Sequence, residues 1–432
     1  MPLKHSVEEI ILTNGARGLL IDTPDATAVH YDIQFRAGND YAPSKSVSQV
    51  AHIMEHMSFG PNERYDSLEK FSRDFGRHGA YHNAWTGAVD MVYTVHAALL
   101  EWQRILDLQL LAITKPKFSE QSLVAEKGNV HEEITGYANN HGRILWQTMM
   151  RDAGLTRWFD ADEIKTIDNV TLNDIEAHYK KTHTAKNMRF IFAGDLAAHR
   201  DEIIEILEAS SLPTGELLPL GIDTPHATGP VFIHRKDLPS LTFNLSFILA
   251  RQLNRKELRA MRALNDIITG SFHSRIWGEA RSRGICYDMG AWLDNDPTGS
   301  STWGIGGQVS PANAKELFEL IAAQLMKISK EGVTDEELQE SKDSRMGALQ
   351  MGTETVRSLA SWYGSEYYEN NRIDYVDAMP ELITGTTVEE IQALMEEFIG
   401  ASAWSFGGIG DIKKAEFDVH YNLLVKQLNK LK

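Results

Sequence analysis

Alternating apolar and polar residues mark several strands along the chain. Residues 29–38 (VHYDIQFRAG) alternate as a half-buried strand does, and residues 241–250 (LTFNLSFILA) repeat this character 212 positions later. Residues 189–195 and 404–411 are strand-like apolar runs that both end in Gly-Asp. Residues 79–94 carry a pattern typical of a hairpin. The pattern therefore predicts strands in both halves of the chain.

Apolar residues recur at helical spacing between these strands. The clearest such segments are residues 118–137, 317–330 and 335–349. We therefore predict an α+β fold, in which each half is a mostly antiparallel sheet packed with helices.

Corresponding segments of the two halves recur at a nearly constant offset. Residues 170–175 resemble residues 386–391, and these two segments, like the two Gly-Asp pairs, lie 216 positions apart. This repeat indicates an internal duplication, and its period is far too long for a solenoid. The residues around 212–230 concentrate Pro, Gly and Thr without an apolar period, as linkers do. We predict a catalytic first half of residues 1–212, a linker of residues 213–229 and a homologous second half of residues 230–432.

Composition and charge limit the possible partners. The chain has 432 residues, of which 42% are hydrophobic, and its net charge is −17, which repels phosphate backbones. The N-terminal residues lack the features of a signal or transit peptide, and no apolar run approaches the roughly 20 residues that span a bilayer. The single cysteine, Cys286, fits a reducing compartment. We expect a cytoplasmic protein that binds neither nucleic acid nor membranes.

The most specific chemical signal is the segment from His52 to His56 (HIMEH). On a helix, positions i and i+4 share a face, so both imidazoles can reach one ion, and Glu55 lies between them in angle. The apolar residues of the same segment lie on roughly the opposite side: Val47, Val50, Ala51, Met54 and Met57. This is the arrangement of a zinc site on a helix. The alternative is a polar surface helix whose histidines bind nothing.

A third protein ligand is expected, because catalytic zinc usually takes three and leaves one position for water. Glu126 and Glu133 are seven residues apart, so on a helix they share a face, whereas Glu132 points toward solvent. Carboxylates on a packed face are costly unless they are paired or bound to a cation. A surface helix with several glutamates is the alternative.

Taken together, these residues resemble the pitrilysin/insulinase family of zinc metallopeptidases, the M16-type inverzincins. More narrowly, the chain resembles the short-chain subfamily that includes mitochondrial processing peptidase. H-x-x-E-H is the inverted zincin motif, and Glu133 follows His56 by 77 positions. Three further segments fit the family: residues 79–86 (GAYHNAWT), residues 187–195 and residues 274–287 (SRIWGEARSRGICY). The resemblance covers the whole chain and implies the LuxS/MPP-like metallohydrolase fold.

The resemblance implies roles for the residues of the first half. It makes His52, His56 and Glu133 the zinc ligands. Glu55 is then the general base that activates the zinc-bound water and passes its proton to the leaving amine. Glu126 becomes a carboxylate that supports the ligands.

The resemblance also implies residues that contact the substrate. Asn83 and Ala84 would lie on an edge strand that receives an extended peptide, and Arg281 and Tyr287 would stabilise the tetrahedral oxyanion. The family spaces this Arg and Tyr seven apart, but here they are six apart, so Arg283 is a competing candidate and Tyr287 is the firmer assignment.

The second half does not repeat the metal site. A shift of 212 positions replaces the motif residues by apolar ones: Leu264, Ile267 and Ile268. The chain is therefore expected to hold one metal ion, with a catalytically silent second half, as in the family.

Other candidate sites are weaker. His78 and His82 are four apart, but Gly79 between them argues against a helix. Cys286 has no visible activating partner and is expected to be a small buried residue near the site. The aromatic residues at helical spacing are expected in the core: Trp362, Tyr363, Tyr367 and Tyr368.

We therefore predict a zinc-dependent endopeptidase that cleaves peptides or small unfolded polypeptides in an extended conformation. The family resemblance implies a dimer, either of two identical chains or of this chain with a related one. The alternative is a non-catalytic or heterodimer-dependent subunit of a peptidase or a larger complex.

Overall fold

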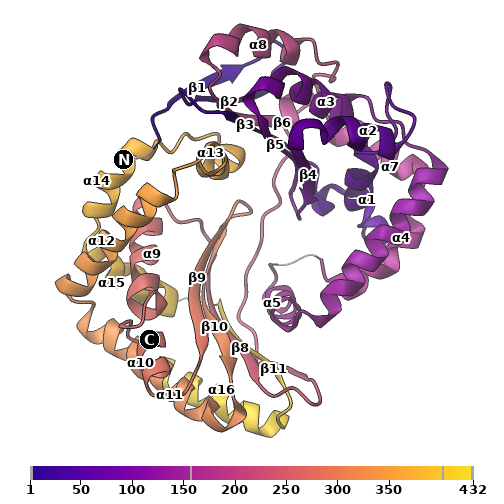
Figure 1. Ribbon diagram of the computed structural model, residues 1–432. Coiled ribbons are helices and arrows are strands. Elements are labelled where there is room, and N and C mark those ends of the chain that lie inside the picture. The colour runs from indigo at the N-terminus through magenta and orange to yellow at the C-terminus, as the bar shows by residue number, and fades with distance from the viewer. Residues whose placement is uncertain (1–2, 156–157, 401–402, 430–432) are drawn as a thin grey trace. The chain divides into compact units, whose positions relative to one another are not determined.

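Six strands of the first half form one sheet in the order β1-β2-β6-β3-β5-β4, as a computed structural model shows (Figure 1). The structure describes residues 3–155, 158–400 and 403–429. Only β2 and β6 pair in parallel. The strands are β1 (Ser6–Ile11), β2 (Arg17–Asp22), β3 (Ala28–Arg36), β4 (Tyr81–Thr86), β5 (Asp90–Ala98) and β6 (Met188–Gly194). Alternate residues of β3, such as Tyr31 and Phe35, enter a hydrophobic core.

Helices cover the core face of this sheet and position the motif residues. The helices closest to the site are α1 (Val50–Ser58), α3 (Trp102–Thr114), α4 (Glu120–Gly136) and α7 (Leu172–Thr182). Helix α1 packs against α4, α7 and β4. Its apolar face is buried as predicted, with Val50, Ala51 and Met54 fully shielded from solvent. This packing leaves the histidines of α1 facing α4.

The second sheet repeats the first. Its order, β7-β11-β8-β10-β9, matches β2-β6-β3-β5-β4 strand for strand, and β7 and β11 again pair in parallel. The strands are β7 (Val231–His234), β8 (Leu241–Leu249), β9 (Asp288–Asp296), β10 (Ser300–Val309) and β11 (Ala403–Gly410). Its core helices are α9 (Arg255–Thr269), α11 (Pro311–Glu331), α15 (Val388–Gly400) and α16 (Lys414–Leu428). The predicted duplication and the mostly antiparallel α+β class are confirmed.

The chain folds into two compact units, which differ from the two halves of the sequence because each half contributes one helix to the other unit. Helix α5 (His141–Asp152) packs on β8 and β11, and its counterpart α13 (Val356–Asn370) packs on β3 and β6. One unit consists of Met1–Tyr137, Asp160–Leu220 and Leu349–Val376, and the other contains the remaining segments. The linear division at residues 212 and 230 therefore does not coincide with the units, because each sheet takes one covering helix from the other half of the sequence.

Six further helices complete the described α-helices. They are α2 (Leu68–Phe75), α6 (Asp160–Glu163), α8 (Arg200–Glu208), α10 (Trp277–Ser282), α12 (Asp335–Met351) and α14 (Met379–Thr384). No helix in the described parts of the chain is long and apolar enough to cross a membrane.

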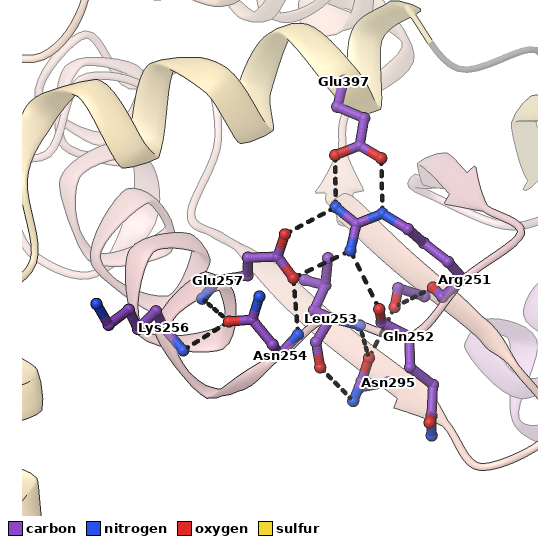
Figure 2. A network of polar contacts seen from close by, with 9 residues as sticks. Arg251, Gln252, Leu253, Asn254, Lys256, Glu257, Asn295 and Glu397 are labelled. Atoms are coloured by element: carbon purple, nitrogen blue, oxygen red, sulfur yellow. Dashed lines mark hydrogen bonds and ion pairs between the residues drawn. The ribbon is translucent and has the colours of Figure 1, made fainter.

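Arg251, in the connection between β8 and α9, forms ion pairs with two helices (Figure 2). Its guanidinium contacts both carboxylate oxygens of Glu397 on α15 and both of Glu257 on α9. Glu257 also forms a capping box with Asn254, the residue before α9. One side chain thus links a strand end, a helix start and a second helix.

Candidate metal centre

The histidines of the HIMEH segment lie on the partly exposed face of α1. His52 and His56 are one turn apart, and their ring centroids are 4.9 Å apart. Both rings are half-buried, whereas Ile53, Met54 and Met57 on the other side of the helix are buried in the core. The helix thus holds two imidazoles at the edge of a packed core.

Helix α4 supplies a carboxylate to both imidazoles. Glu133 Oε2 lies 3.5 Å from His52 Nε2 and 3.6 Å from His56 Nε2. One ligand atom from each of these three residues lies within 4.8 Å of the others. Two imidazole nitrogens and a carboxylate oxygen are a donor set that divalent transition metals accept, so the residues fit a metal ion.

Charge around the two imidazoles also favours a cation. Hydrogen bonds from His52, His56 and the Tyr137 hydroxyl hold the pKa of Glu133 well below its usual range. Burial opposes protonation of His56, but its hydrogen bonds to Glu126 and Glu133 raise its pKa to about 10. Surroundings that hold a proton on His56 this firmly would equally attract a divalent cation.

Each imidazole is oriented through its Nδ1 atom. His56 Nδ1 lies 3.0 Å from Glu126 Oε2, which also accepts a hydrogen bond from Asn129. His52 Nδ1 lies 3.0 Å from Gln49 Oε1. With Nδ1 engaged on both rings, the Nε2 atoms remain directed at Glu133 as potential ligands.

Glu55 lies beside the three potential ligands but is buried. Its side chain is 7% exposed, and burial raises its pKa. Thr86 Oγ1, at the end of β4, donates a 2.7 Å hydrogen bond to Glu55 Oε2. A buried carboxylate with a raised pKa and a fixed orientation is suited to general base catalysis.

Strand β4 lies at the edge of its sheet and carries Asn83 and Ala84. It pairs with β5 on one side, and in the described chain no strand pairs with its other side. Ala84 is buried, whereas Asn83 is exposed and donates a 3.0 Å hydrogen bond to the Tyr81 hydroxyl. The free edge can accept an extended peptide as a further strand.

Arg281 and Tyr287 lie together in the second unit. The Arg281 guanidinium carbon is 4.0 Å from the centroid of the Tyr287 ring, and its Nη1 donates to the Tyr287 carbonyl at 3.0 Å. Arg283 forms ion pairs with Glu279 and Glu316 instead. Of the two candidate arginines, Arg281 is therefore the one beside Tyr287, a residue that is 78% exposed.

The remaining predicted positions behave as structural residues. Leu264, Ile267 and Ile268 on α9 are buried in the second core. His78 is exposed in a turn, while His82 stacks on Phe75. Glu132 is exposed, and the core holds Cys286, Tyr363 and Tyr367, whereas Trp362 and Tyr368, also predicted in the core, are half-buried. Within the described residues, the group formed by His52, His56 and Glu133 is the one cluster that could hold a metal.

Sequence reasoning missed three residues that contact the site. Gln49 and Tyr137 bond to His52 and Glu133, respectively, and Glu163 contacts Gln49. Gln49 precedes His52 by three positions on the same helical face, a spacing that could have identified it. Glu163 comes from a four-residue helix far along the chain, which carries no such signal.

Comparison with family models gives two matches that together span most of the chain. Residues 17–158 match the model described as Insulinase (Peptidase family M16). Residues 169–345 match the model described as Peptidase M16 inactive domain. The first match contains the metal cluster, and the second contains α9 with its apolar replacements for the motif residues.

Similar proteins are found among curated sequences. The chain is 21% identical to an uncharacterized zinc protease of Bacillus subtilis over 89% of this chain and 93% of that protein. It is 22% identical to an uncharacterized zinc protease of Streptomyces coelicolor over 94% of this chain and 90% of that protein.

Solved structures share the fold across nearly the whole chain. A protease from Helicobacter pylori superposes with a TM-score of 0.80 at 18% identity, covering 95% of this chain and 100% of that one. A peptidase M16 inactive domain from Pseudomonas fluorescens superposes with a TM-score of 0.82 at 19% identity, covering 94% and 99%.

Proposed function

Because the chain belongs to the insulinase family, peptidase M16, we propose that it is a zinc-dependent endopeptidase acting on extended peptides or small unfolded polypeptides. The observation that carries this proposal is the convergence of His52, His56 and Glu133, with the buried Glu55 on the same helix. A non-catalytic relative would not need all four groups. The names of the curated relatives, which are zinc proteases, support the choice of metal.

In the proposed mechanism, zinc held by His52, His56 and Glu133 would supply Lewis acidity toward the scissile carbonyl and the attacking water. Glu55 removes a proton from that water and later delivers it to the amine nitrogen that leaves. The hydrogen bond from Thr86 keeps the Glu55 carboxylate in one orientation for both transfers. Glu126 and Gln49 keep the two imidazoles in the tautomer that presents Nε2.

We propose that the substrate binds along the free edge of β4. Main-chain hydrogen bonds would hold a peptide extended at this edge, with Asn83 and Ala84 beside it. Thr86 belongs to the same strand and bonds Glu55, so the strand that aligns the peptide also fixes the general base. This link favours substrates that can become a strand, which excludes stably folded proteins.

We assign Arg281 and Tyr287 to binding and oxyanion stabilisation. The Arg281 guanidinium stacks on the Tyr287 ring and donates to the Tyr287 carbonyl, so two contacts fix the position of this exposed residue. We further propose that two chains associate, as the family resemblance implies. Native mass spectrometry of the purified chain distinguishes a homodimer from a chain that needs a related partner for activity.

The proposal is tested by measuring metal content and peptide cleavage together. Purified wild type is expected to contain about one zinc per chain and to cleave an unstructured peptide in a chelator-sensitive reaction. His52→Ala and Glu133→Ala are expected to lose both properties. Equal zinc in all three proteins would refute the metal site, and zinc without cleavage by any assembly would favour the non-catalytic alternative.

A further inference from the structure

The two imidazoles differ in what holds their Nδ1 atoms. His56 Nδ1 faces the Glu126 carboxylate directly at 3.0 Å. His52 Nδ1 faces Gln49 Oε1, the oxygen of a neutral amide, also at 3.0 Å. A side-chain amide has a donor end and an acceptor end of nearly the same shape. Gln49 can therefore orient His52 only if another group determines which end points at the ring.

Glu163 is the group in contact with the other end of Gln49. Burial, followed by the charge of Asp160, raises the pKa of Glu163 to about 7, and hydrogen bonds from Gln49 and Asn39 oppose this rise. Both amides therefore donate to the carboxylate, Asn39 Nδ2 at 2.8 Å. Gln49 is 1% exposed and Glu163 is 6% exposed, so water competes little for these bonds.

We propose that Glu163 is a positioning residue for the metal centre, acting through Gln49 on the tautomer of His52. Above pH 7, where Glu163 is ionised, its carboxylate only accepts hydrogen bonds, so the NH₂ end of Gln49 turns toward Glu163 and its oxygen turns toward His52. That oxygen accepts the Nδ1 proton and leaves the Nε2 lone pair available on the side of Glu133. We call this chain of hydrogen bonds, from Glu163 through Gln49 to His52, the relay. The inference rests on the proposed function, in which His52 binds zinc.

A purely structural role does not explain the choice of residue. A buried carboxylate is costly, and a neutral amide could bond Gln49 and Asn39 without that cost. A glutamine at position 163 would both donate and accept, and it would no longer dictate the orientation of Gln49.

Metal affinity tests the relay. Zinc affinity, measured at pH 8 by competition with a chromophoric chelator, is expected to fall about 10- to 100-fold in Glu163→Gln, as when other groups that orient metal ligands are removed. Glu126→Gln, which acts on the other histidine, is expected to show a loss of similar size. Asp162→Asn is the matched control, because it removes one charge from the same short helix at an exposed position. It should bind zinc as wild type does.

A double variant separates positioning from structural support. In Gln49→Glu with Glu163→Gln, the carboxylate moves next to His52, as Glu126 stands next to His56. Zinc affinity is expected to return to within a few-fold of wild type, and ¹⁵N NMR of the histidines should show the Nδ1-protonated form of His52 in zinc-loaded protein. A structural role would leave the double variant as weak as Glu163→Gln.

The outcomes are distinguishable. Glu163→Gln affinity within twofold of wild type, or a double variant without recovery, overturns the relay while leaving the proposed function intact. Wild type that binds no more zinc than His52→Ala overturns the proposed function and the relay with it. Thermal unfolding of each variant shows that the fold is retained.

Discussion

Thr86 Oγ1 donates a 2.7 Å hydrogen bond to the Oε2 atom of Glu55, which joins the edge strand β4 to the helix that carries both histidines. The strand proposed to align a peptide is therefore hydrogen-bonded directly to the carboxylate proposed to activate water. A change at either residue should affect turnover without removing the metal, since neither belongs to the three-residue cluster.

Replacing Glu55 by Gln should separate metal binding from catalysis. The amide keeps the shape of the side chain and can still bond Thr86, but it cannot accept a proton from water. We expect zinc content equal to wild type and a fall in kcat/KM of about 100-fold or more. Glu132→Gln, an exposed position on α4, is the control for loss of one acidic charge. Undiminished turnover by Glu55→Gln would refute the mechanism.

Replacing Thr86 by Val should shift the pH profile of catalysis. The Thr86 hydroxyl stabilises the ionised form of Glu55 and so opposes the rise in its pKa caused by burial. Without that bond the pKa rises further, and the acidic limb of kcat/KM moves to higher pH. A hydrogen bond to a charged group is worth about 1.5–3 kcal/mol, so the acidic limb should move up by about one pH unit or more. Thr86→Ser should retain the wild-type profile, and an unchanged limb in the valine variant would contradict the assignment.

A glycine is required at position 38 because the backbone of residues 87 and 88, just after Thr86, passes close to it. A Cβ built at Gly38 would lie 2.4 Å from the carbonyl oxygen of Gly87 and 2.5 Å from that of Ala88, in the turn that follows Thr86. Gly38→Ala should therefore displace the turn, reduce stability by about 1–3 kcal/mol and reduce activity as well. Gly347→Ala, a helical site where the added methyl meets nothing within 4 Å beyond its own helix backbone, should be slightly stabilising. Urea unfolding of both variants measures the difference.

The sequence allowed the sheets, the duplication and the metal cluster to be predicted, because each depends on local periodicity or on motif spacing. The HIMEH helix illustrates this: its apolar residues had to be buried, which left His52 and His56 on the opposite face. The distance between α1 and α4 could not be derived from such patterns and entered through the family resemblance.

The positions of α5 and α13 could not be predicted from periodicity. An amphipathic helix must cover some apolar surface, but nothing in its own sequence says which of two similar sheets it will cover. Glu163 was missed for a related reason. Its contact with Gln49 joins residues more than 100 positions apart, and neither lies in an apolar pattern. The choice between Arg281 and Arg283 likewise needed the ion pairs that occupy Arg283.

Two buried histidines predict how stability depends on pH. Burial lowers the pKa of His178 to about 4 and that of His183 to about 3, below the ordinary value near 6.5. The unfolded chain therefore binds more protons than the folded protein below pH 6.5, so the free energy of unfolding falls as the pH drops toward 4. Each histidine contributes up to about 1.4 kcal/mol per pH unit in this range.

The contribution of His178 can be isolated by replacement. His178 Nε2 lies 2.9 Å from the carbonyl oxygen of Ala37, to which a glutamine amide can also donate. His178→Gln should lose about 2 kcal/mol less stability than wild type when the pH falls from 7 to 5. His131→Gln, at an exposed position, should follow wild type. Chemical unfolding of the three proteins in chelator holds the titration of His52 and His56 common to all of them. Parallel curves for wild type and His178→Gln would show that this imidazole is not excluded from protons in the folded state.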